Sequence, residues 1–285
     1  MSAPRRVTPR DFVKKKQRGE RIVMITAYSY PQARIVDAAG VDGILVGDSV
    51  AMVELGLPAT IYVSMKEMLH HVRAVARARP RALVVGDMPF MSYERSRSEA
   101  LRNAAAFIRA GADAVKLEGG AEVADRVEAL VKAGIPVMGH VGLTPQRFLT
   151  IGGYRLMGKK AEQAAKLLED AKAREDAGAF AVVIENTVAE VAAEITKRLR
   201  IPTICIGSGP WCDGQIIVLH DIVGLTEEPP YFTRRYADVA SVMRRAVESY
   251  VEDVRSGRFP GEGMYRRMKP EELEAFRKLL RELDR

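Results

Sequence analysis

Residues 43–48 read Gly-Ile-Leu-Val-Gly-Asp, and residues 82–87 read Ala-Leu-Val-Val-Gly-Asp. Each stretch is a short apolar run that ends in Gly-Asp, which is typical of a buried β-strand followed by a turn. A longer, helix-like segment lies between them, near residues 64–78. A strand, a helix and a second strand in this order predict a βαβ unit with parallel strands.

The same alternation extends in both directions along the chain. Candidate strands lie at residues 22–26, 43–46, 82–85, 114–117, 136–139, 181–184, 203–206 and 216–219. Helix-like segments lie near residues 30–39, 64–78, 95–110, 121–133, 160–177 and 187–199, and residues 233–257 follow the last strand. This pattern predicts an α/β protein with the (βα)8 TIM-barrel fold. The stretch between the last two strands is short for a full helix, so a doubly wound open sheet stays as the alternative.

Both ends of the chain carry predicted helices outside the barrel. An N-terminal helix over residues 9–18 has Thr8 as its N-cap. A charged, amphipathic C-terminal tail covers residues 261–285, with Pro270 near a helix start. One stripe of that helix carries Leu273, Phe276, Leu280 and Leu283. We expect the stripe to pack on the chain's own barrel or to contact another subunit. Because no Pro-, Gly- or Ser-rich linker divides the sequence, residues 1–285 are predicted to form a single catalytic domain.

Composition and charge argue against several classes of protein. A chain of 285 residues with 47% apolar and 28% charged residues suits one barrel with a large core. No apolar run approaches the roughly 18–20 residues of a membrane span, and the N-terminus lacks the apolar region of a secretion signal. The net charge is +7, but the basic residues are interspersed with acids, which argues against nucleic-acid binding. A modest positive field would instead attract a small anionic metabolite.

The sequence contains two cysteines, Cys205 and Cys212. They lack metal-ligand spacing and are too few for a disulfide framework, so a reducing cytoplasm is the expected location.

Glycine and polar residues follow six successive predicted strands. They are Gly47-Asp48-Ser49, Gly86-Asp87, Lys116-Leu117-Glu118-Gly119-Gly120, Gly139-His140, Glu185 and Gly207-Ser208-Gly209. In a (βα)8 barrel all of these positions lie on the C-terminal rim, where active sites are built. Any single acid here could simply cap a helix. Six such positions in register indicate an active site.

The residue types at this rim favour a particular chemistry. The aspartates and Glu118 have no Cys or His pair beside them, which favours a hard, oxygen-liking cation such as Mg²⁺. Lys116 would supply positive charge for a substrate carboxylate, or would form a salt bridge with one of the acids. Glu185 stands alone after the sixth strand and is the candidate general base, since burial would raise its pKa toward a useful range.

Other common sites find little support in the sequence. A zinc site would need Cys or His ligands, and the four histidines are His70, His71, His140 and His220. One of the adjacent pair is expected to face the core, and His220 could support the site from behind or be structural. No dinucleotide-binding, Walker or Gly-x-Ser-x-Gly motif is present. Residues 207–209 could approach an anion with backbone N–H groups or form a plain turn.

Six motifs occur in an order that makes a family recognisable. They are ILVGDSVAMVELGLPAT (44–60), VVGDMPFMSYERS (84–96), AGADAVKLEGG (110–120), GIPVMGHVGLTPQ (134–146), GGYRLMGK (152–159) and CDGQIIVLHDIVGL (212–225). Together they resemble the ketopantoate hydroxymethyltransferases over about residues 8–260, nearly nine-tenths of the chain.

The resemblance implies a barrel that assembles as a homo-oligomer, commonly a decamer. It implies transfer of a one-carbon unit from 5,10-methylenetetrahydrofolate to C3 of 3-methyl-2-oxobutanoate, in pantothenate and coenzyme A biosynthesis. Asp48 and Asp87 match the family's Mg²⁺ ligands, and Glu118 matches a third acid that binds directly or through water. Asp48 and Asp87 would thereby also contact the substrate. The other matches are Ser49 and Lys116 for oxo-acid contacts, Glu185 for the proton acceptor, and His140 for a substrate or product contact.

A few positions depart from the family pattern. Ser29 replaces a usual Asp, and Gly207-Ser208-Gly209 replaces Gly-Ala-Gly. After Glu185 the usual Val-Pro is replaced by Asn186-Thr187-Val188, which puts the local loop geometry in doubt.

Two alternatives to this function stay open. One is another metal-enolate barrel enzyme, a C–C lyase or phosphonomutase-like protein. Such lyases typically use a reactive cysteine in a mobile loop, and neither cysteine has that setting. The other alternative is a non-catalytic barrel, which would be expected to have lost at least one of the acids.

Overall fold

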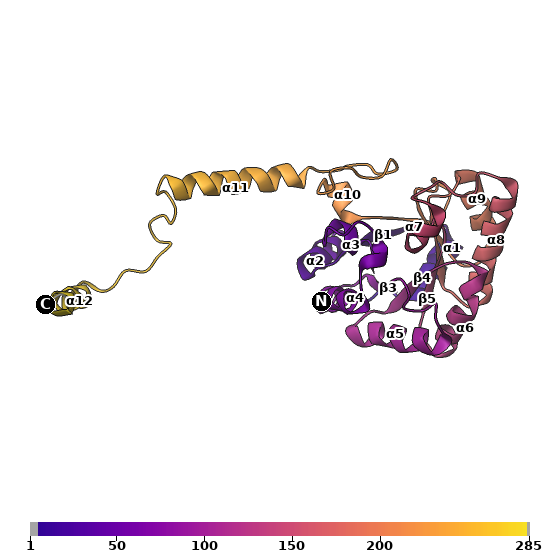
Figure 1. Cartoon of the computed structure of the whole chain (residues 1–285), viewed down its shortest axis with the longest axis horizontal. Coiled ribbons are helices and arrows are strands. Elements are labelled where there is room, and N and C mark those ends of the chain that lie inside the picture. The colour runs from indigo at the N-terminus through magenta and orange to yellow at the C-terminus, as the bar shows by residue number, and fades with distance from the viewer. Residues whose placement is uncertain (1–4, 284–285) are drawn as a thin grey trace. The chain divides into compact units, whose positions relative to one another are not determined.

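The computed structural model describes residues 5–283 and shows eight parallel strands closed into a barrel (Figure 1). The strands are β1 (Ile22–Thr26), β2 (Gly43–Val46), β3 (Leu83–Asp87), β4 (Ala114–Glu118), β5 (Val137–Gly142), β6 (Ala181–Glu185), β7 (Thr203–Ile206) and β8 (Gly214–Ile217). They pair in chain order, and β8 pairs with β1 to close the ring. The predicted (βα)8 barrel is confirmed, and the open-sheet alternative is wrong.

Helices surround the barrel and connect its strands (Figure 1). The longer ones are α2 (Tyr30–Ala38), α4 (Met65–Arg77), α5 (Arg97–Ala110), α6 (Ala124–Lys132), α8 (Ala161–Asp176) and α9 (Ala189–Arg198). Shorter elements at the strand-to-helix connections are α3 (Val50–Val53), α7 (Phe148–Ile151), α10 (Leu219–Val223), η1 (Thr60–Tyr62), η2 (Ala121–Val123) and η3 (Pro145–Arg147). No helix lies between β7 and β8, as the short predicted connection indicates. None of the helices in residues 5–283 is long and apolar enough to cross a lipid bilayer.

Local sequence signals set the ends of these helices. Ser64 caps α4, because its hydroxyl accepts from the backbone N–H of Glu67 while the Glu67 carboxylate accepts from the N–H of Ser64. Gly111 ends α5 in the left-handed region, with φ at 107°. These signals fix where each helix starts and stops, and therefore where each following strand begins.

The inside of the barrel is filled by inward-facing apolar side chains. This cluster contains Ile22, Met24, Leu45, Leu83, Val85, Ala114, Met138, Ala181, Val183, Ile204 and Ile216. The predicted N-terminal helix is α1 (Pro9–Arg18), and its Phe12 is fully buried in the same cluster and packs edge-on against Phe180. Burying each large side chain of this kind contributes roughly 1.5–3 kcal/mol. The interior is thus a packed core, and polar chemistry is confined to the strand ends.

Several strands run one or more residues further than the sequence predicts. Asp87, Glu118 and Glu185 are the last residues of β3, β4 and β6, and each takes part in strand pairing. His140 lies inside β5, which continues to Gly142, whereas the sequence predicts that the strand ends before it. The eighth strand is displaced toward the N-terminus, at 214–217 instead of 216–219.

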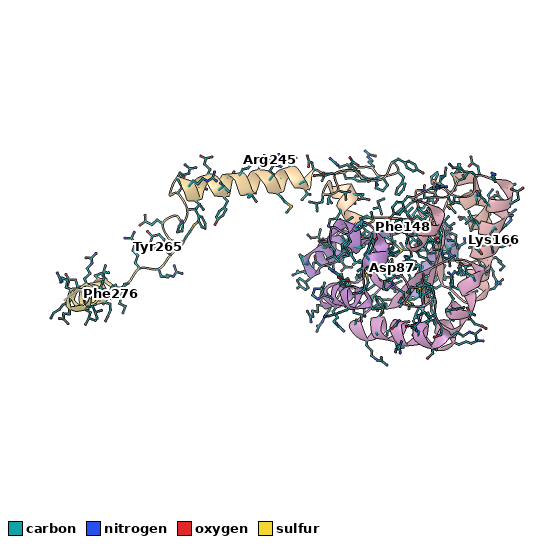
Figure 2. The ribbon with its side chains drawn as sticks, viewed as in Figure 1. Asp87, Phe148, Lys166, Arg245, Tyr265 and Phe276 are labelled. Atoms are coloured by element: carbon teal, nitrogen blue, oxygen red, sulfur yellow. A yellow bond between two sulfur atoms is a disulfide. The ribbon has the colours of Figure 1, made fainter. Side chains whose placement is uncertain are left out.

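The chain forms two compact units, with the boundary between Tyr236 and Ala237. The first contains the whole barrel. The second contains α11 (Val239–Arg255) and α12 (Pro270–Leu283), and neither helix has a buried residue. Figure 2 shows Asp87 inside the ring of barrel helices and Lys166 on its outside. The boundary lies upstream of residue 261, where the predicted tail begins.

Candidate active site

A cavity of about 550 Å³ opens at the C-terminal ends of the barrel strands. All seven predicted site residues line it: Asp48, Ser49, Asp87, Lys116, Glu118, His140 and Glu185. The structure therefore brings together residues that lie up to 137 positions apart in the sequence (185 minus 48). Parallel strands deliver them to one rim because every strand ends at the same side of the barrel.

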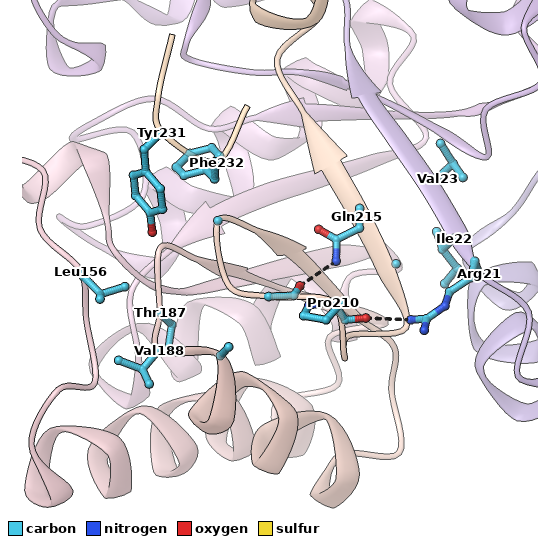
Figure 3. Close-up of a pocket in the computed structure, with 14 residues that line it drawn as sticks. Arg21, Ile22, Val23, Leu156, Thr187, Val188, Pro210, Gln215, Tyr231 and Phe232 are labelled. Atoms are coloured by element: carbon cyan, nitrogen blue, oxygen red, sulfur yellow. Dashed lines mark hydrogen bonds between the residues drawn. The ribbon is translucent and has the colours of Figure 1, made fainter. Parts of the chain in front are cut away.

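A second hollow, of about 810 Å³, lies beside β1 and β8 (Figure 3). Arg21 donates to the carbonyl of Pro210 (3.3 Å), and Gln215 Nε2 donates to the carbonyl of Gly209 (3.0 Å). None of the predicted acids lines this larger hollow. We therefore assign the chemistry to the smaller cavity at the barrel mouth.

Asp48, Asp87 and Glu118 are buried around a single ammonium group, that of Lys116. Lys116 Nζ lies 2.7 Å from Asp87 Oδ1 and 3.9 Å from Glu118 Oε1, so the salt bridge named above as the alternative role of Lys116 is present. The backbone N–H of Asp48 donates to Asp87 Oδ2 (3.1 Å). Three buried carboxylates thus share one cation, which leaves the cluster short of positive charge.

The burial of these groups changes their proton affinities. Burial raises the pKa of Asp87 to about 7, opposed by the Lys116 ammonium and reinforced by Asp48. Burial also raises the pKa of Glu118 well above its usual range. For Lys116, burial lowers the pKa, but the carboxylates of Asp87, Glu118 and Asp48 together raise it above its ordinary value. The lysine is therefore a permanent cation.

The donor set of this cluster fits a divalent, oxygen-liking metal ion. Glu118 Oε1 is buried and accepts no hydrogen bond within the described chain, although Lys116 and His140 lie near it. No three His, Cys, Asp or Glu side chains of residues 5–283 form a ligand cage by themselves. Mg²⁺ commonly binds through only one or two protein carboxylates and keeps water or substrate oxygens for the rest. Asp48 and Asp87 match that arrangement.

His140 connects the lysine to the candidate base. Its Nδ1 lies 3.2 Å from Lys116 Nζ, and its Nε2 lies 3.3 Å from Glu185 Oε2. Burial and the nearby Lys116 lower the pKa of His140 well below its usual range, so the ring is neutral. An ammonium can only donate, so Nδ1 is the acceptor and the ring hydrogen is on Nε2, facing the Glu185 carboxylate.

Glu185 stands at the end of β6 with its side chain 19% exposed to the cavity. Burial raises its pKa to about 8, opposed by Lys116 and reinforced by Asp48. The predicted upward shift is confirmed. A carboxylate with this proton affinity is suited to removing a proton from carbon near neutral pH.

Gln146 is a site residue that the sequence analysis did not identify. Its Nε2 donates to Asp48 Oδ2 (2.9 Å) and to the carbonyl of Met88 (3.0 Å), and its backbone N–H donates to Glu118 Oε2 (3.0 Å). The hydroxyl of Tyr93 donates to Gln146 Oε1 (2.9 Å). The only sequence signal was its place at the end of the 134–146 motif. Its side-chain amide and its backbone N–H together hold two of the three acids, Asp48 and Glu118, in place.

The turn after β6 has a defined geometry despite its departure from the family pattern. Asn186 has φ at 40°, and its Oδ1 accepts from the Tyr231 hydroxyl (3.0 Å). The Ser208 hydroxyl accepts from the N–H of Thr187 (2.9 Å) and donates to the carbonyl of Ile184 (2.8 Å). Ser208 therefore ties the β7–β8 connection to the turn that presents Glu185, which favours the structural interpretation of residues 207–209.

The remaining predicted polar residues flank the cavity. Ser49 Oγ is 2.9 Å from the Tyr28 hydroxyl. His71 Nδ1 lies 2.8 Å from the carbonyl of Tyr28, and His220 Nε2 lies 3.2 Å from Glu54 Oε1. Neither histidine lines the cavity.

The two cysteines, Cys205 and Cys212, form one disulfide bond across the β7–β8 connection, with their Cα atoms 5.8 Å apart. Both are fully buried, and no free cysteine remains. Neither sulfur is therefore available as the reactive thiol that the lyase alternative would require.

Solved structures with the same fold come from a group of barrel enzymes. A phosphonopyruvate hydrolase in complex with oxalate and Mg²⁺ aligns with a TM-score of 0.60, at 15% identity over 96% of both chains. A 2,3-dimethylmalate lyase of the PEP mutase/isocitrate lyase superfamily aligns with a TM-score of 0.57, at 18% identity over 99% of this chain and 98% of the other. At these identities the likeness shows the shared fold alone.

Sequence relatives are much closer. A 3-methyl-2-oxobutanoate hydroxymethyltransferase of Hyperthermus butylicus is 60% identical over 99% of this chain and 98% of its own length. The protein of the same name in Pyrobaculum islandicum is 65% identical over 92% of this chain and 99% of its own. The model of the family described as ketopantoate hydroxymethyltransferase matches residues 6–262. The chain therefore belongs to the ketopantoate hydroxymethyltransferase family, as its motifs predicted.

Proposed function

We propose that this protein transfers a hydroxymethyl group from 5,10-methylenetetrahydrofolate to C3 of 3-methyl-2-oxobutanoate, giving 2-dehydropantoate. The names of its relatives support the reaction. The observation that carries the proposal is the position of Glu185. It faces the same cavity as the Asp48, Asp87 and Glu118 cluster and has a pKa of about 8.

In this proposal Asp48 and Asp87 hold Mg²⁺, and Glu118 contacts it directly or through water. The metal would withdraw electrons from the keto group of the substrate and so make the C3–H bond more acidic. Lys116 and Ser49 contact the oxo acid, since an ammonium and a hydroxyl can both donate to its oxygens.

The proton at C3 is transferred to a carboxylate oxygen of Glu185. His140 Nε2 lies 3.3 Å from Oε2 of that carboxylate, so its N–H is close enough to donate to Glu185 when the two groups align. The carbanion equivalent formed at C3 then forms a C–C bond to the one-carbon unit of the folate. Both bonds from that carbon to N5 and N10 break, and water supplies the hydroxyl group. The proton held by Glu185 and the remaining proton of the water pass to the two nitrogens, and tetrahydrofolate leaves. The exposed side of the cavity admits the second substrate.

The experiment is NMR measurement of Mg²⁺-dependent hydrogen–deuterium exchange at C3 of 3-methyl-2-oxobutanoate, without folate. Glu185→Gln should lower the exchange rate at least 100-fold, because the amide cannot accept the proton. Binding of Mg²⁺ and the oxo acid should change little. Glu122→Gln, which alters a carboxylate paired with Arg147 outside this cavity, should exchange like the parent.

The pH dependence gives a second check of the same assignment. Glu185 must be ionised to accept a proton, so exchange by the parent should rise with pH through about 8. Exchange at the parental rate in Glu185→Gln would remove Glu185 from this role. Addition of methylenetetrahydrofolate separates the proposed transferase from an enzyme that only enolises its substrate.

A further inference from the structure

The cavity at the barrel mouth extends well beyond the acids. A five-carbon oxo acid would occupy only a small part of its 550 Å³. The outer part is lined by Tyr154, Asp221, Thr226, Tyr231 and Phe232. The mechanism proposed above gives none of these residues a role. They combine flat aromatic rings with one buried carboxylate.

The aromatic rings are exposed but held in place. Tyr154 is 48% exposed and stacks on Phe148, with an interplanar angle of 13°. Tyr231 is 76% exposed. Its hydroxyl donates to Asn186 Oδ1, and its ring packs edge-on against Phe232. Large aromatic rings that stay exposed on the wall of a cavity commonly mark the position of a flat ligand.

Tyr154 also lies close to the reacting groups. It lines the same cavity as Asp48, Glu118 and Glu185, and burial, reinforced by those three carboxylates, raises the pKa of Tyr154 to about 12. Its hydroxyl contacts Met52 Sδ at 3.4 Å. Tyr154 therefore connects the acid cluster with the outer part of the cavity, which is where the second substrate must lie.

Asp221 is a buried carboxylate without a cation partner. The residue is 4% exposed, and its Oδ1 accepts from the Thr226 hydroxyl at 2.7 Å. No lysine or arginine of residues 5–283 forms an ion pair with it. Asp221 lines the cavity, and the Thr226 hydroxyl occupies only one of its two carboxylate oxygens. It therefore has capacity to accept hydrogen bonds from a ligand.

A 2-amino-4-oxopteridine ring has the complementary groups. Its 2-amino group and N3–H are neighbouring donors on one edge, and a carboxylate has two neighbouring acceptor oxygens. The flat ring itself can stack on tyrosine. We propose that Asp221 recognises the 2-amino and N3–H donors of the pteridine ring of the one-carbon donor, and that Tyr154 and Tyr231 contact its faces. This assignment rests on the proposed function, and it adds the residues that select the second substrate.

The test separates the two substrates. Asp221→Asn should raise the KM for methylenetetrahydrofolate at least 10-fold, because the new amide presents a donor to the donors of the ring. C3 exchange of the oxo acid without folate should stay within twofold of the parent. Glu227→Gln, an exposed carboxylate nearby in the chain that does not line the cavity, is the matched control and should leave both measurements unchanged.

A second pair of measurements guards against misfolding and identifies the part of the folate that is recognised. Thr226→Val keeps the carboxylate but removes its hydroxyl partner, and should raise the same KM about threefold. 6-Methyltetrahydropterin should compete with methylenetetrahydrofolate in the parent, and p-aminobenzoylglutamate should not.

The outcomes are distinguishable from a failure of the proposed function. No C3 exchange by the parent would overturn the proposed function itself. A parental KM in Asp221→Asn, or competition only by p-aminobenzoylglutamate, would overturn the pteridine assignment while leaving that function intact. If Asp221→Asn lost both C3 exchange and hydroxymethyl transfer, the pteridine assignment would also be overturned, because Asp221 would then act on the oxo acid.

Discussion

Gln146 determines which oxygen atoms of the acid cluster stay available. Its amide cannot be flipped, because Asp48 Oδ2 and the carbonyl of Met88 need a donor and the Tyr93 hydroxyl needs an acceptor. Its backbone N–H occupies Glu118 Oε2. Glu118 Oε1 is left buried without a hydrogen bond from the described chain. We infer that Gln146 is a positioning residue for the proposed metal site.

Gln146→Met should therefore weaken metal binding while the barrel still folds. Methionine has a similar length and is apolar, so the Asp48 carboxylate would lose its donor and its fixed orientation. Loss of a contact that orients a metal ligand typically costs 10–100-fold in metal affinity. We expect the Kd for Mn²⁺, measured by calorimetry or EPR on the protein without substrate, to rise about 10-fold.

The matched control for this variant is Gln215→Met. Gln215 also donates through Nε2 to a backbone carbonyl, but it lies outside the barrel mouth (Figure 3). The Gln215→Met variant should change the Kd for Mn²⁺ less than twofold. Equal affinities in the parent and Gln146→Met would show that Gln146 has a packing role only.

At this scale the sequence predicts residues that directly follow a strand, and misses those that reach the site from a loop. Asp48, Asp87 and Glu185 could be placed because strand ends meet at one rim in any (βα)8 barrel. Gln146 lies in the short element η3 after β5 and Asp221 in α10 after β8, and helical elements of only three to five residues are too short to give a periodic signal. Their contacts depend on side-chain reach, which only the three-dimensional structure shows.

At the scale of elements, three of the predicted strands ended too early for one physical reason. A strand pattern in sequence is mainly a pattern of apolar side chains, so each of these predictions stopped before the acid at the strand end. The backbone ladder does not depend on side-chain polarity, and Asp87, Glu118 and Glu185 still pair with neighbouring strands. The acids are consequently held by rigid sheet instead of by flexible loop.

Gly142 shows how closely β5 and β6 must approach at the site. Its φ is 94°, and a Cβ there would lie 2.3 Å from the carbonyl oxygen of Glu185. Gly142→Ala should therefore displace the backbone that carries the base. We expect C3 exchange to fall at least 10-fold and the free energy of unfolding to fall by about 1–3 kcal/mol.

Gly153→Ala is the control that separates the steric clash of a new Cβ from the conformational cost of placing alanine at a positive φ. Gly153 has φ at 109°, and a Cβ there would have no atom within 4 Å. It should lower stability by the conformational cost alone, and should keep exchange near the parental rate. If Gly142→Ala exchanged as fast as Gly153→Ala, the position of the Glu185 backbone would not control catalysis.

At the scale of the whole molecule, the barrel and the C-terminal helices differ in how they bury their residues. Every predicted site residue lies in the first unit, which ends at Tyr236. Within the segment 233–257 that follows the last predicted strand, α11 forms over Val239–Arg255. Periodicity could predict that α11 and α12 are amphipathic. It could not predict what covers their apolar faces, because that depends on surfaces outside the helices themselves.

The tail beyond residue 262 should be dispensable for chemistry. The family model ends at residue 262. A chain truncated after residue 262 should therefore keep C3 exchange and hydroxymethyl transfer within twofold of the parent. NMR exchange and a steady-state transfer assay measure the two activities.

The same truncation should nevertheless lower the melting temperature by several degrees. Phe276 and Leu283 of α12 are 47% and 80% exposed, and an apolar stripe of this kind is normally covered by a subunit or by the protein's own surface. Light scattering after gel filtration distinguishes these cases, because loss of a subunit contact reduces the mass of the assembly and loss of an internal contact does not. Loss of exchange without a change in melting temperature would instead place the tail in the active site, and would contradict the prediction that residues up to 262 suffice for catalysis.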